Sequence, residues 1–275
     1  VSGTALTMTA QDYESPACGS GSNSLTCVVV LAATDAGSTH STAHTITVTI
    51  TDVNDQAPVW TTSATASVAE GATAVATMAA TDTDTADANG LTYSITTNDP
   101  SGSVFAVSGT ALTMTAQDYE TPACGSASNS LTCVVVLAAT DAAGTATAHT
   151  ITVTITDTND NTPSFTDGDS ASASVEEGAT TVATYAATDG DSSTAHNTIA
   201  YSVSGGADSS LFSVVSNTGA LSFSTAPDYD SGSACAAGNS CVVELTASDG
   251  SLTDTITVTV AVTDANDQAP VWTTS

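Results

Sequence analysis

A long internal repeat constrains the fold of this chain more than any other feature. Residues 2–34 recur as residues 108–140, and the two segments differ at only two of 33 positions. The four-residue marker Asp-x-Asn-Asp begins at residues 52, 157 and 264, and these starts are 105 and 107 residues apart. Each repeat therefore has the size of roughly one small domain.

The pattern within each repeat predicts β-strands. Residues 45–50, 150–155 and 255–260 alternate polar and apolar side chains, as half-buried strands do. Short continuous apolar runs, Val28–Leu31 and Val134–Leu137, are typical of buried central strands. About seven such segments per repeat, separated by Gly, Asp and Ser clusters, predict an all-β chain of tandem Greek-key β-sandwiches.

The copies also set the expected domain boundaries. We predict the C-terminal half of a repeat over residues 1–54, complete repeats over 55–160 and 161–267, and the start of a following repeat over 268–275. This arrangement favours a segment of a longer array. Donation of a strand between subunits is the alternative, although the last eight or nine residues cannot replace about 43 missing ones. A combination of the two stays open.

The charge balance is one-sided. The chain has 29 Asp and Glu residues but no Lys or Arg, which gives a formal net charge of −29. Nucleic acids and anionic membrane surfaces are excluded as partners because both are bound through basic side chains. An apolar share of 41% still supports real cores. Cations are therefore the expected partners.

Small hydroxyl side chains and paired cysteines indicate the compartment. The chain has 53 Thr and 36 Ser residues. The β-branched Thr side chains suit strands, and the many hydroxyl groups also offer a surface for O-linked sugars. The six cysteines form close pairs, and their repeated positions predict disulfides and an extracellular or cell-surface location. These pairs are Cys18/Cys27, Cys124/Cys133 and Cys235/Cys241. No apolar run approaches 20 residues, so this segment is not expected to insert into a membrane.

Several acidic motifs resemble the calcium-binding cadherin repeat over essentially the whole chain. Residues 157–165 read Asp-Thr-Asn-Asp-Asn-Thr-Pro-Ser-Phe, similar to the family's linker, and the other two linkers have Gln in place of the second Asn. Acidic motifs of the D-x-E and D-x-D types and the glutamates near the first strand are also similar to the family's. The resemblance implies cadherin/immunoglobulin-like sandwiches in an elongated rod, with about three calcium ions at each junction between repeats. The cysteine pairs are not a general feature of the family, and we interpret them as clamps on the loops next to the metal.

The chemistry of calcium explains this pattern, because Ca²⁺ takes six to eight oxygen ligands. Loops at the two ends of successive sandwiches would bring the acidic motifs together. At the first junction we expect Asp12, Glu14, Asp52, Asn54, Asp55, Asp82, Asp84 and Asp141, and the resemblance adds a carbonyl of Asn89. At the second we expect Glu70, Asp118, Glu120, Asp157, Asn159, Asp160, Asp189, Asp191 and Asp249, with carbonyls of Asn161 and Asn197 by resemblance. At the third we expect Glu177, Asp228, Asp230, Asp264, Asn266 and Asp267, and Asp35 belongs to an upstream junction.

No motif indicates catalysis, so we predict that the chain is not an enzyme. The four histidines accompany neither a G-x-S-x-G nor an H-E-x-x-H sequence. The expected function is a calcium-rigidified extracellular structural repeat, as a segment of a long surface fibre or filament whose partners are further copies of itself. The alternative is a cell-surface adhesin that binds itself or a surface receptor in a calcium-dependent way.

Overall fold

The computed structural model describes residues 5–18, 25–37, 41–84, 90–98, 104–124, 131–232 and 234–272, except the side chain of Asn98. The chain divides into two compact units. Unit 1 contains Val1–Gln117 and Ala123–Ile155, and unit 2 contains Asp118–Pro122 and Thr156–Ser275. Within the described residues the regular structure is all strand, apart from one 3-10 turn, η2 (Ser209–Leu211). None of the described helical segments has the length and apolar character of a membrane span.

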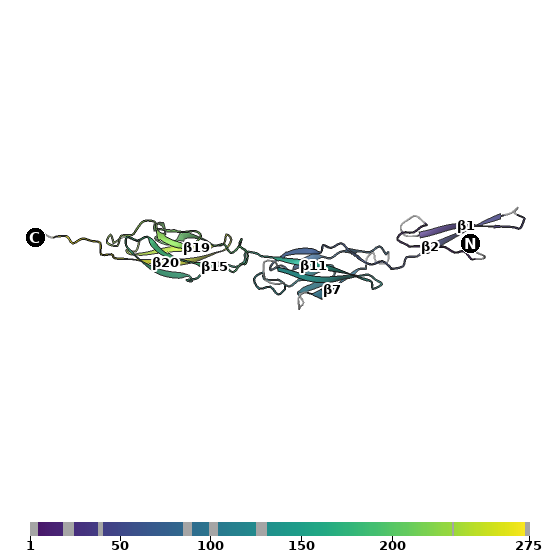
Figure 1. The fold of residues 1–275 in the computed structure, drawn as a ribbon, viewed down its shortest axis with the longest axis horizontal. Coiled ribbons are helices and arrows are strands. Elements are labelled where there is room, and N and C mark those ends of the chain that lie inside the picture. The colour runs from purple at the N-terminus through teal and green to yellow at the C-terminus, as the bar shows by residue number, and fades with distance from the viewer. Residues whose placement is uncertain are drawn as a thin grey trace. The chain divides into compact units, whose positions relative to one another are not determined.

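Unit 1 contains a hairpin and a β-sandwich (Figure 1). The hairpin pairs β1 with β2, and the sandwich has a four-stranded sheet of order β4-β11-β10-β7 and a three-stranded sheet of order β5-β9-β8. A short β3-β6 pair completes the unit. The strands are β1 (Leu25–Thr34), β2 (Ser41–Ile50), β3 (Val59–Trp60), β4 (Thr65–Ala69), β5 (Ala74–Thr77), β6 (Ala80–Thr81), β7 (Thr92–Asn98), β8 (Phe105–Ser108), β9 (Ala111–Met114), β10 (Leu131–Thr140) and β11 (Ala146–Thr156).

Unit 2 contains a sandwich of the same topology. Its sheets have the orders β13-β20-β19-β16 and β14-β18-β17, with a short β12-β15 pair. β13 runs parallel to β20, whereas β19 is antiparallel to both β20 and β16. The strands are β12 (Ser164–Phe165), β13 (Ser170–Glu176), β14 (Thr181–Thr184), β15 (Ala187–Thr188), β16 (Ala200–Gly205), β17 (Phe212–Val214), β18 (Ala220–Phe223), β19 (Ser240–Ser248) and β20 (Thr253–Thr263).

Alternation along the strands builds both cores. In β11, Ile151, Val153 and Ile155 are at most 2% exposed, and the threonines between them point the other way. The same alternation in β20 buries Ile256, Val258 and Val260 completely. Strands with one apolar face pack two sheets together, so the predicted β-sandwich fold is confirmed.

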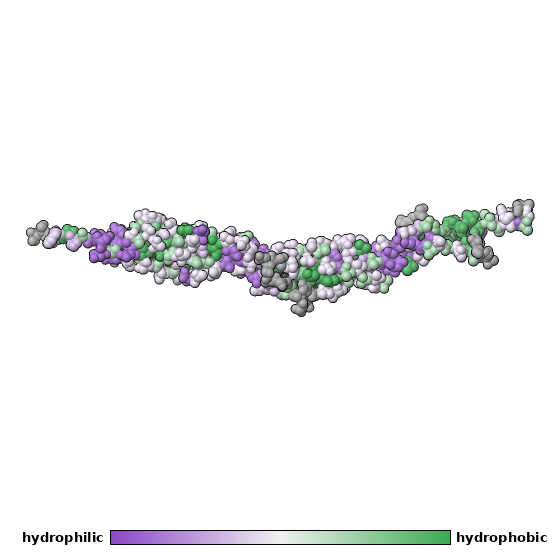
Figure 2. Space-filling view, in the orientation of Figure 1, coloured by the Kyte–Doolittle hydropathy of each residue, from purple (hydrophilic) through white to green (hydrophobic). Residues whose placement is uncertain are grey.

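The β1-β2 hairpin repeats the register of β10-β11 but is far more exposed. Leu25 pairs with Ile50 as Leu131 pairs with Ile155. Preceding the hairpin, Leu6 and Met8 are 41% and 48% exposed, although their counterparts Leu112 and Met114 are 1% and 4% exposed within the sandwich. Figure 2 shows this hydrophobic surface in green around the hairpin.

Candidate metal centres at the sandwich ends

The D-x-E loops are folded around their aspartates. Asp118 Oδ1 accepts backbone N–H groups from Glu120 and Thr121 at 2.9 and 3.2 Å, and its Oδ2 accepts the Thr121 hydroxyl at 2.6 Å. Asp12 makes the equivalent bonds to Glu14 and Ser15. The hydroxyl bond is the main reason that the pKa of each aspartate lies below its usual value. Each loop therefore presents its glutamate in a fixed turn.

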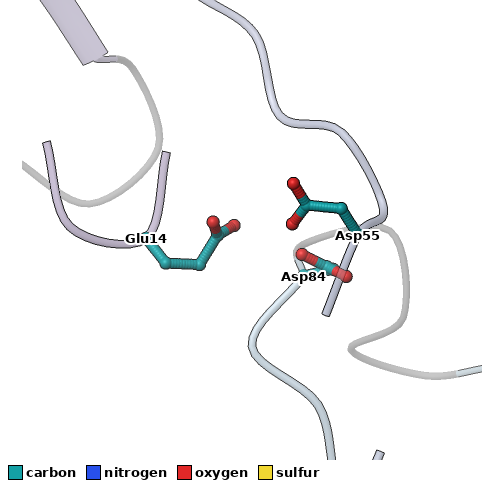
Figure 3. Close-up of side chains that lie close together, drawn as sticks. All are labelled: Glu14, Asp55 and Asp84. Carbon is teal, nitrogen blue, oxygen red and sulfur yellow. The ribbon is translucent and has the colours of Figure 1, made fainter. Parts of the chain in front are cut away.

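Three carboxylates from three segments converge in unit 1. Oxygen atoms of Glu14, Asp55 and Asp84 all lie within 4.8 Å of one another, and the side chains point toward a common centre (Figure 3). Asp84 is 1% exposed, and its Oδ2 accepts the Gln56 backbone N–H at 2.9 Å. Burial of the Glu14 carboxyl, with Asp12 and Asp52 beside it, raises the pKa of Glu14 to about 7. Two carboxylates about 5 Å apart repel by roughly 3 kcal/mol at an effective dielectric constant near 20.

Unit 2 contains the corresponding triplet, Glu120, Asp160 and Asp191, again within 4.8 Å. The Ser192 backbone N–H donates to Glu120 Oε1 at 3.0 Å. Asp191 is 3% exposed and takes the position of Asp84 in the D-x-D loop. The same three motif positions therefore converge in both units.

A second triplet in unit 2 lies among Asp189, Asp191 and Asp249. Burial and its two neighbours raise the pKa of Asp189, and Asp191 N–H bonds its Oδ1 at 2.9 Å. The pKa of Asp249 lies below its usual value. Burial acts to raise it, but hydrogen bonds from the backbone N–H groups of Ser251 and Leu252, at 2.7 and 2.8 Å, lower it by more. Asp191 thus belongs to two triplets and can bridge two cations.

The far end of unit 2 brings together Glu177, Asp230 and Asp264. Backbone N–H groups of Ala265 and Tyr229 bond the two Glu177 oxygens at 2.8 and 2.7 Å and lower its pKa. Burial is the main cause that raises the pKa of Asp230, and the charges of Glu177 and Asp264 add to it. One end of unit 2 therefore holds carboxylates of opposite pKa shift side by side.

Nine oxygen atoms from the triplets and from other expected ligands are buried and lack a hydrogen-bond partner among the described residues. They come from carboxylates and one side-chain amide, and all are lone-pair acceptors. In unit 1 they are Glu14 Oε1, Asp82 Oδ2, Asp84 Oδ1 and Asp141 Oδ2. In unit 2 they are Asp157 Oδ1, Asn159 Oδ1, Asp189 Oδ2, Asp191 Oδ2 and Asp249 Oδ2. Buried acceptors are costly when unpaired, and the chain has no Lys or Arg to neutralise them. These oxygen atoms are therefore suited to an external cation.

The fold places the remaining residues of the expected ligand sets in the loops and at the ends of strands. Asp52 and Asn54 follow β2, Glu70 follows β4, and Asp35 follows β1. Asn161 and Asn197 both contact Asp191, the latter through a 3.0 Å bond from its side-chain amide to the Asp191 carbonyl. Asp228 precedes Asp230, while Asn266 and Asp267 are exposed after β20. Asn89 lies outside the described residues, and the assignment of Glu70 to the second junction stays a prediction.

One contact in unit 2 has no signal in the sequence. His196 Nδ1 lies 3.0 Å from Asp157 Oδ2, which also accepts the Ser193 backbone N–H at 3.1 Å. Two turn bonds, from the N–H groups of His196 and Asn197 to the Ser193 carbonyl, hold this segment over Asp157. Only the fold brings residues 39 positions apart into contact, so spacing could not reveal the pair.

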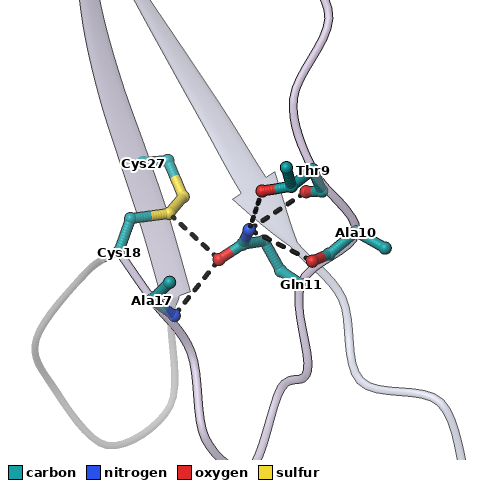
Figure 4. Close-up of a disulfide and its surroundings, with 6 residues drawn as sticks. All are labelled: Thr9, Ala10, Gln11, Ala17, Cys18 and Cys27. Atoms are coloured by element: carbon teal, nitrogen blue, oxygen red, sulfur yellow. Dashed lines mark hydrogen bonds between the residues drawn. A yellow bond between two sulfur atoms is a disulfide. The ribbon is translucent and has the colours of Figure 1, made fainter.

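The cysteines pair as predicted, and each bond lies next to an acidic motif. Figure 4 shows the first disulfide, where the Gln11 side chain accepts the Ala17 backbone N–H at 3.2 Å and donates to the Thr9 carbonyl at 3.0 Å. No cysteine belongs to a metal-binding triplet of the described residues. The three disulfides are Cys18–Cys27, Cys124–Cys133 and Cys235–Cys241.

Each of the three disulfides ties a loop to a strand. Cys27, Cys133 and Cys241 lie within β1, β10 and β19, and Cys241 is completely buried in the core of unit 2. Its partner Cys235 precedes the strand and is 6% exposed. The bond therefore ties the loop after the Asp228 motif to a core strand, which the cysteine spacing alone could not show.

A buried aspartate supports the same loop. Asp208 accepts backbone N–H groups from Ala236 and Val242, the two residues that follow the bonded cysteines, at 2.6 and 2.8 Å. Sequence reasoning missed Asp208, which lies in no triplet of the described residues. Its contacts are those of a structural residue.

Comparison with known proteins identifies the class of this fold. Residues 171–263 match the family model described as Cadherin domain. Similar solved structures include the protocadherin gamma B2 extracellular cadherin domains 3-6 (24% identity, TM-score 0.63, covering 82% of this chain and 55% of that chain). Mouse clustered PcdhgC3 EC1-3 gives 22% identity, a TM-score of 0.65 and coverages of 92% and 80%. The human desmocollin-1 ectodomain gives 23% identity and a TM-score of 0.58, and the match covers 87% of this chain and 48% of that chain. No curated protein matches the chain.

Residues 171–263 therefore form a cadherin domain, and both sandwiches have the cadherin-like fold. The chain spans about half the length of the protocadherin gamma B2 and desmocollin-1 structures. Cadherin domains are extracellular, non-enzymatic modules, so the predictions of an extracellular location and of no enzymatic activity are confirmed. Cadherin domains bind calcium, and the oxygen-only triplets are the donor sets that calcium prefers.

Proposed function

We propose that calcium ions bound at the acidic clusters stiffen the joints between successive repeats, and that the chain is a structural segment of an extracellular fibre or filament. The repeats we propose are residues 55–160 and 161–267, preceded by a half-repeat over 1–54 and followed by the start of another at 268–275. About three ions per junction is the number implied by the family resemblance.

The observation that carries this proposal is the set of nine buried oxygen atoms without hydrogen-bond partners among the described residues. The chain has no Lys or Arg to neutralise these sites. As ligands we assign Glu14, Asp55 and Asp84 at the first junction and Glu120, Asp160, Asp189, Asp191 and Asp249 at the second, because oxygen atoms within each triplet lie within 4.8 Å of one another. A bound cation would remove the repulsion between these carboxylates and tie the D-x-E loop, the linker and the D-x-D loop to one centre.

The stiffness test is small-angle scattering from the whole chain in calcium and then in excess chelator. Binding that requires the folded junction adds to the junction's stability. When calcium is removed, we therefore expect the maximum dimension of the chain to decrease and the distribution of interatomic distances to broaden. A sodium chloride control at matched ionic strength separates specific binding from charge screening. An equal effect of sodium, or a rod unchanged by chelation, contradicts the proposal.

The fibre and adhesin interpretations need a second measurement. A surface of small Ser, Thr and Ala side chains and the near-identity of copies support the fibre. Electron microscopy of the pure chain in calcium should then show polymers. Calcium-dependent clustering of beads that carry the chain, without polymers in solution, would instead support the adhesin.

A further inference from the structure

The three linkers do not all have the same side chain after Asp-x-Asn-Asp, and the difference changes the contacts within the acidic triplets. In unit 2 this residue is Asn161, and its Nδ2 donates to Asp191 Oδ1 at 3.1 Å and to Asp160 Oδ1 at 3.2 Å. One amide therefore bridges two of the three carboxylates in the Glu120 triplet.

In unit 1 the equivalent residue is Gln56, and its amide behaves differently. Gln56 Nε2 donates to Asp55 Oδ1 at 2.8 Å, while only its backbone N–H contacts Asp84. Gln268 repeats this contact, with Nε2 at 2.9 Å from Asp267 Oδ1. Both glutamines thus bond the preceding aspartate, whereas Asn161 links the linker to the D-x-D loop.

The middle residue of the D-x-D loop permits the bridge. It is Gly190 in unit 2 and Thr83 in unit 1. A Cβ atom on residue 190 would lie 2.8 Å from Asn161 Oδ1 and 2.9 Å from its Cγ, which is closer than real Cβ contacts come. The backbone of Gly190 does not itself require glycine, since its φ is not in the left-handed region. Asn161 is what excludes a side chain there.

From this geometry we infer that residues 161 and 190 are a matched pair that positions the Asp160 and Asp191 carboxylates, so that the second junction binds calcium more tightly than the first. This inference rests on the proposed function. The amide holds the two ligands in place before the ion arrives, which lowers the cost of ordering them on binding. One additional net hydrogen bond corresponds to about 3- to 10-fold in affinity.

The test is hydrogen exchange of the full chain, followed by mass spectrometry across a calcium titration. We expect residues 186–191 to reach half-protection at about 3- to 10-fold lower free calcium than residues 79–84. If neither segment responds to calcium, the proposed function fails. If both respond with equal midpoints, only the matched-pair inference fails.

Swapping the pairs between units gives the decisive controls. Asn161→Gln should raise the midpoint of residues 186–191 about 3- to 10-fold and should also reduce their protection in chelator, because the amide bridge does not need the ion. Gly190→Thr alone should displace Asn161 and raise the midpoint at least as much. The double variant N161Q/G190T should be no worse than either single variant, since Gln56 and Thr83 coexist in unit 1.

The reciprocal change tests gain rather than loss. Gln56→Asn alone should leave the midpoint of residues 79–84 unchanged because Thr83 blocks the bridge, whereas Q56N/T83G should lower it several-fold. Additive effects in both units, or a gain from Q56N alone, would overturn the pairing. A loss of thermal stability without any shift in midpoint would overturn it as well, since the pair would then be structural only.

Discussion

The indole ring of Trp60 stacks on the His149 imidazole, with ring centroids 4.9 Å apart and planes inclined by 19°. Trp60 Nε1 also donates to the Thr147 backbone oxygen at 2.8 Å, so the indole joins β3 to β11 by a stacked ring and a hydrogen bond. The strand that leaves the linker is therefore anchored to the four-stranded sheet directly after the acidic motif.

Replacing this anchor should destabilise unit 1. Trp60→Phe removes the hydrogen bond and part of the ring overlap, and we expect a loss of about 1–3 kcal/mol. Circular dichroism during urea unfolding measures it. Trp272 provides a matched control, because it occupies the same nonapeptide but is 94% exposed. Trp272→Phe should change the free energy of unfolding by less than about 0.5 kcal/mol, and equal effects would contradict the anchoring role.

The contact between His196 and Asp157 should order the second junction. His196→Ala removes a hydrogen bond to a carboxylate whose other oxygen is buried and has no partner in the described parts of the chain. We expect a loss of about 0.5–1.5 kcal/mol in unit 2 and weaker calcium binding, measured by calorimetry. His196→Asn should restore most of both, since its amide can reach the same oxygen. A variant H196N that behaves like H196A would show that the ring's packing matters instead.

Calcium binding at the first junction should depend on pH near neutrality, because the pKa of Glu14 is raised to about 7. A raised folded-state pKa means that protonated Glu14 stabilises the calcium-free fold, and this stability is lost as pH rises toward 7. Calcium needs the ionised form, so its affinity should rise over the same interval and level off above it.

Thermal melting from pH 5.5 to 8 checks both signs. In chelator the melting temperature of unit 1 should fall with pH, whereas the stabilisation by calcium should grow. Glu14→Gln cannot ionise, so it should flatten both trends and weaken calcium binding. Unchanged slopes in E14Q would assign the titration to another group.

Sequence patterns predicted most of the fold and singled out the acidic motifs, because both signals are local. The alternation at residues 150–155 requires no knowledge of the partner strand, and it lies within β11. Motif spacing likewise identified Asp189 and Asp191 as candidate ligands, and the fold places both beside Asp249. The internal repeat extended each prediction made for one copy to the equivalent positions of the other copies.

What the sequence could not predict depends on contacts between distant segments. His196 reaches Asp157 across 39 positions, and Asn161 reaches Asp191 across 30. The pairing of Cys241 follows from its spacing, but its place in the core of β19 does not. Neither periodicity nor composition encodes such surroundings, because a side chain's neighbours are set by how the sheets pack.

The loop that carries the second D-x-E motif should depend on Gln117. Its side chain is 4% exposed, donates to the Thr115 carbonyl at 2.8 Å and accepts the Ala123 backbone N–H at 3.1 Å. It therefore spans the loop between Asp118 and the Cys124–Cys133 disulfide. Gln117→Ala leaves a buried N–H without its acceptor, and we expect a loss of about 1–3 kcal/mol.

Gln11 allows this prediction to be tested within the same chain. It makes the same contacts, to Thr9 and Ala17, but it is half-buried, so water can replace the lost bonds in Gln11→Ala. Urea unfolding should give a small change for Q11A and a large one for Q117A, and calcium affinity at the second junction should fall only in Q117A. Equal losses in the two variants would mean that burial does not set the strength of this clamp.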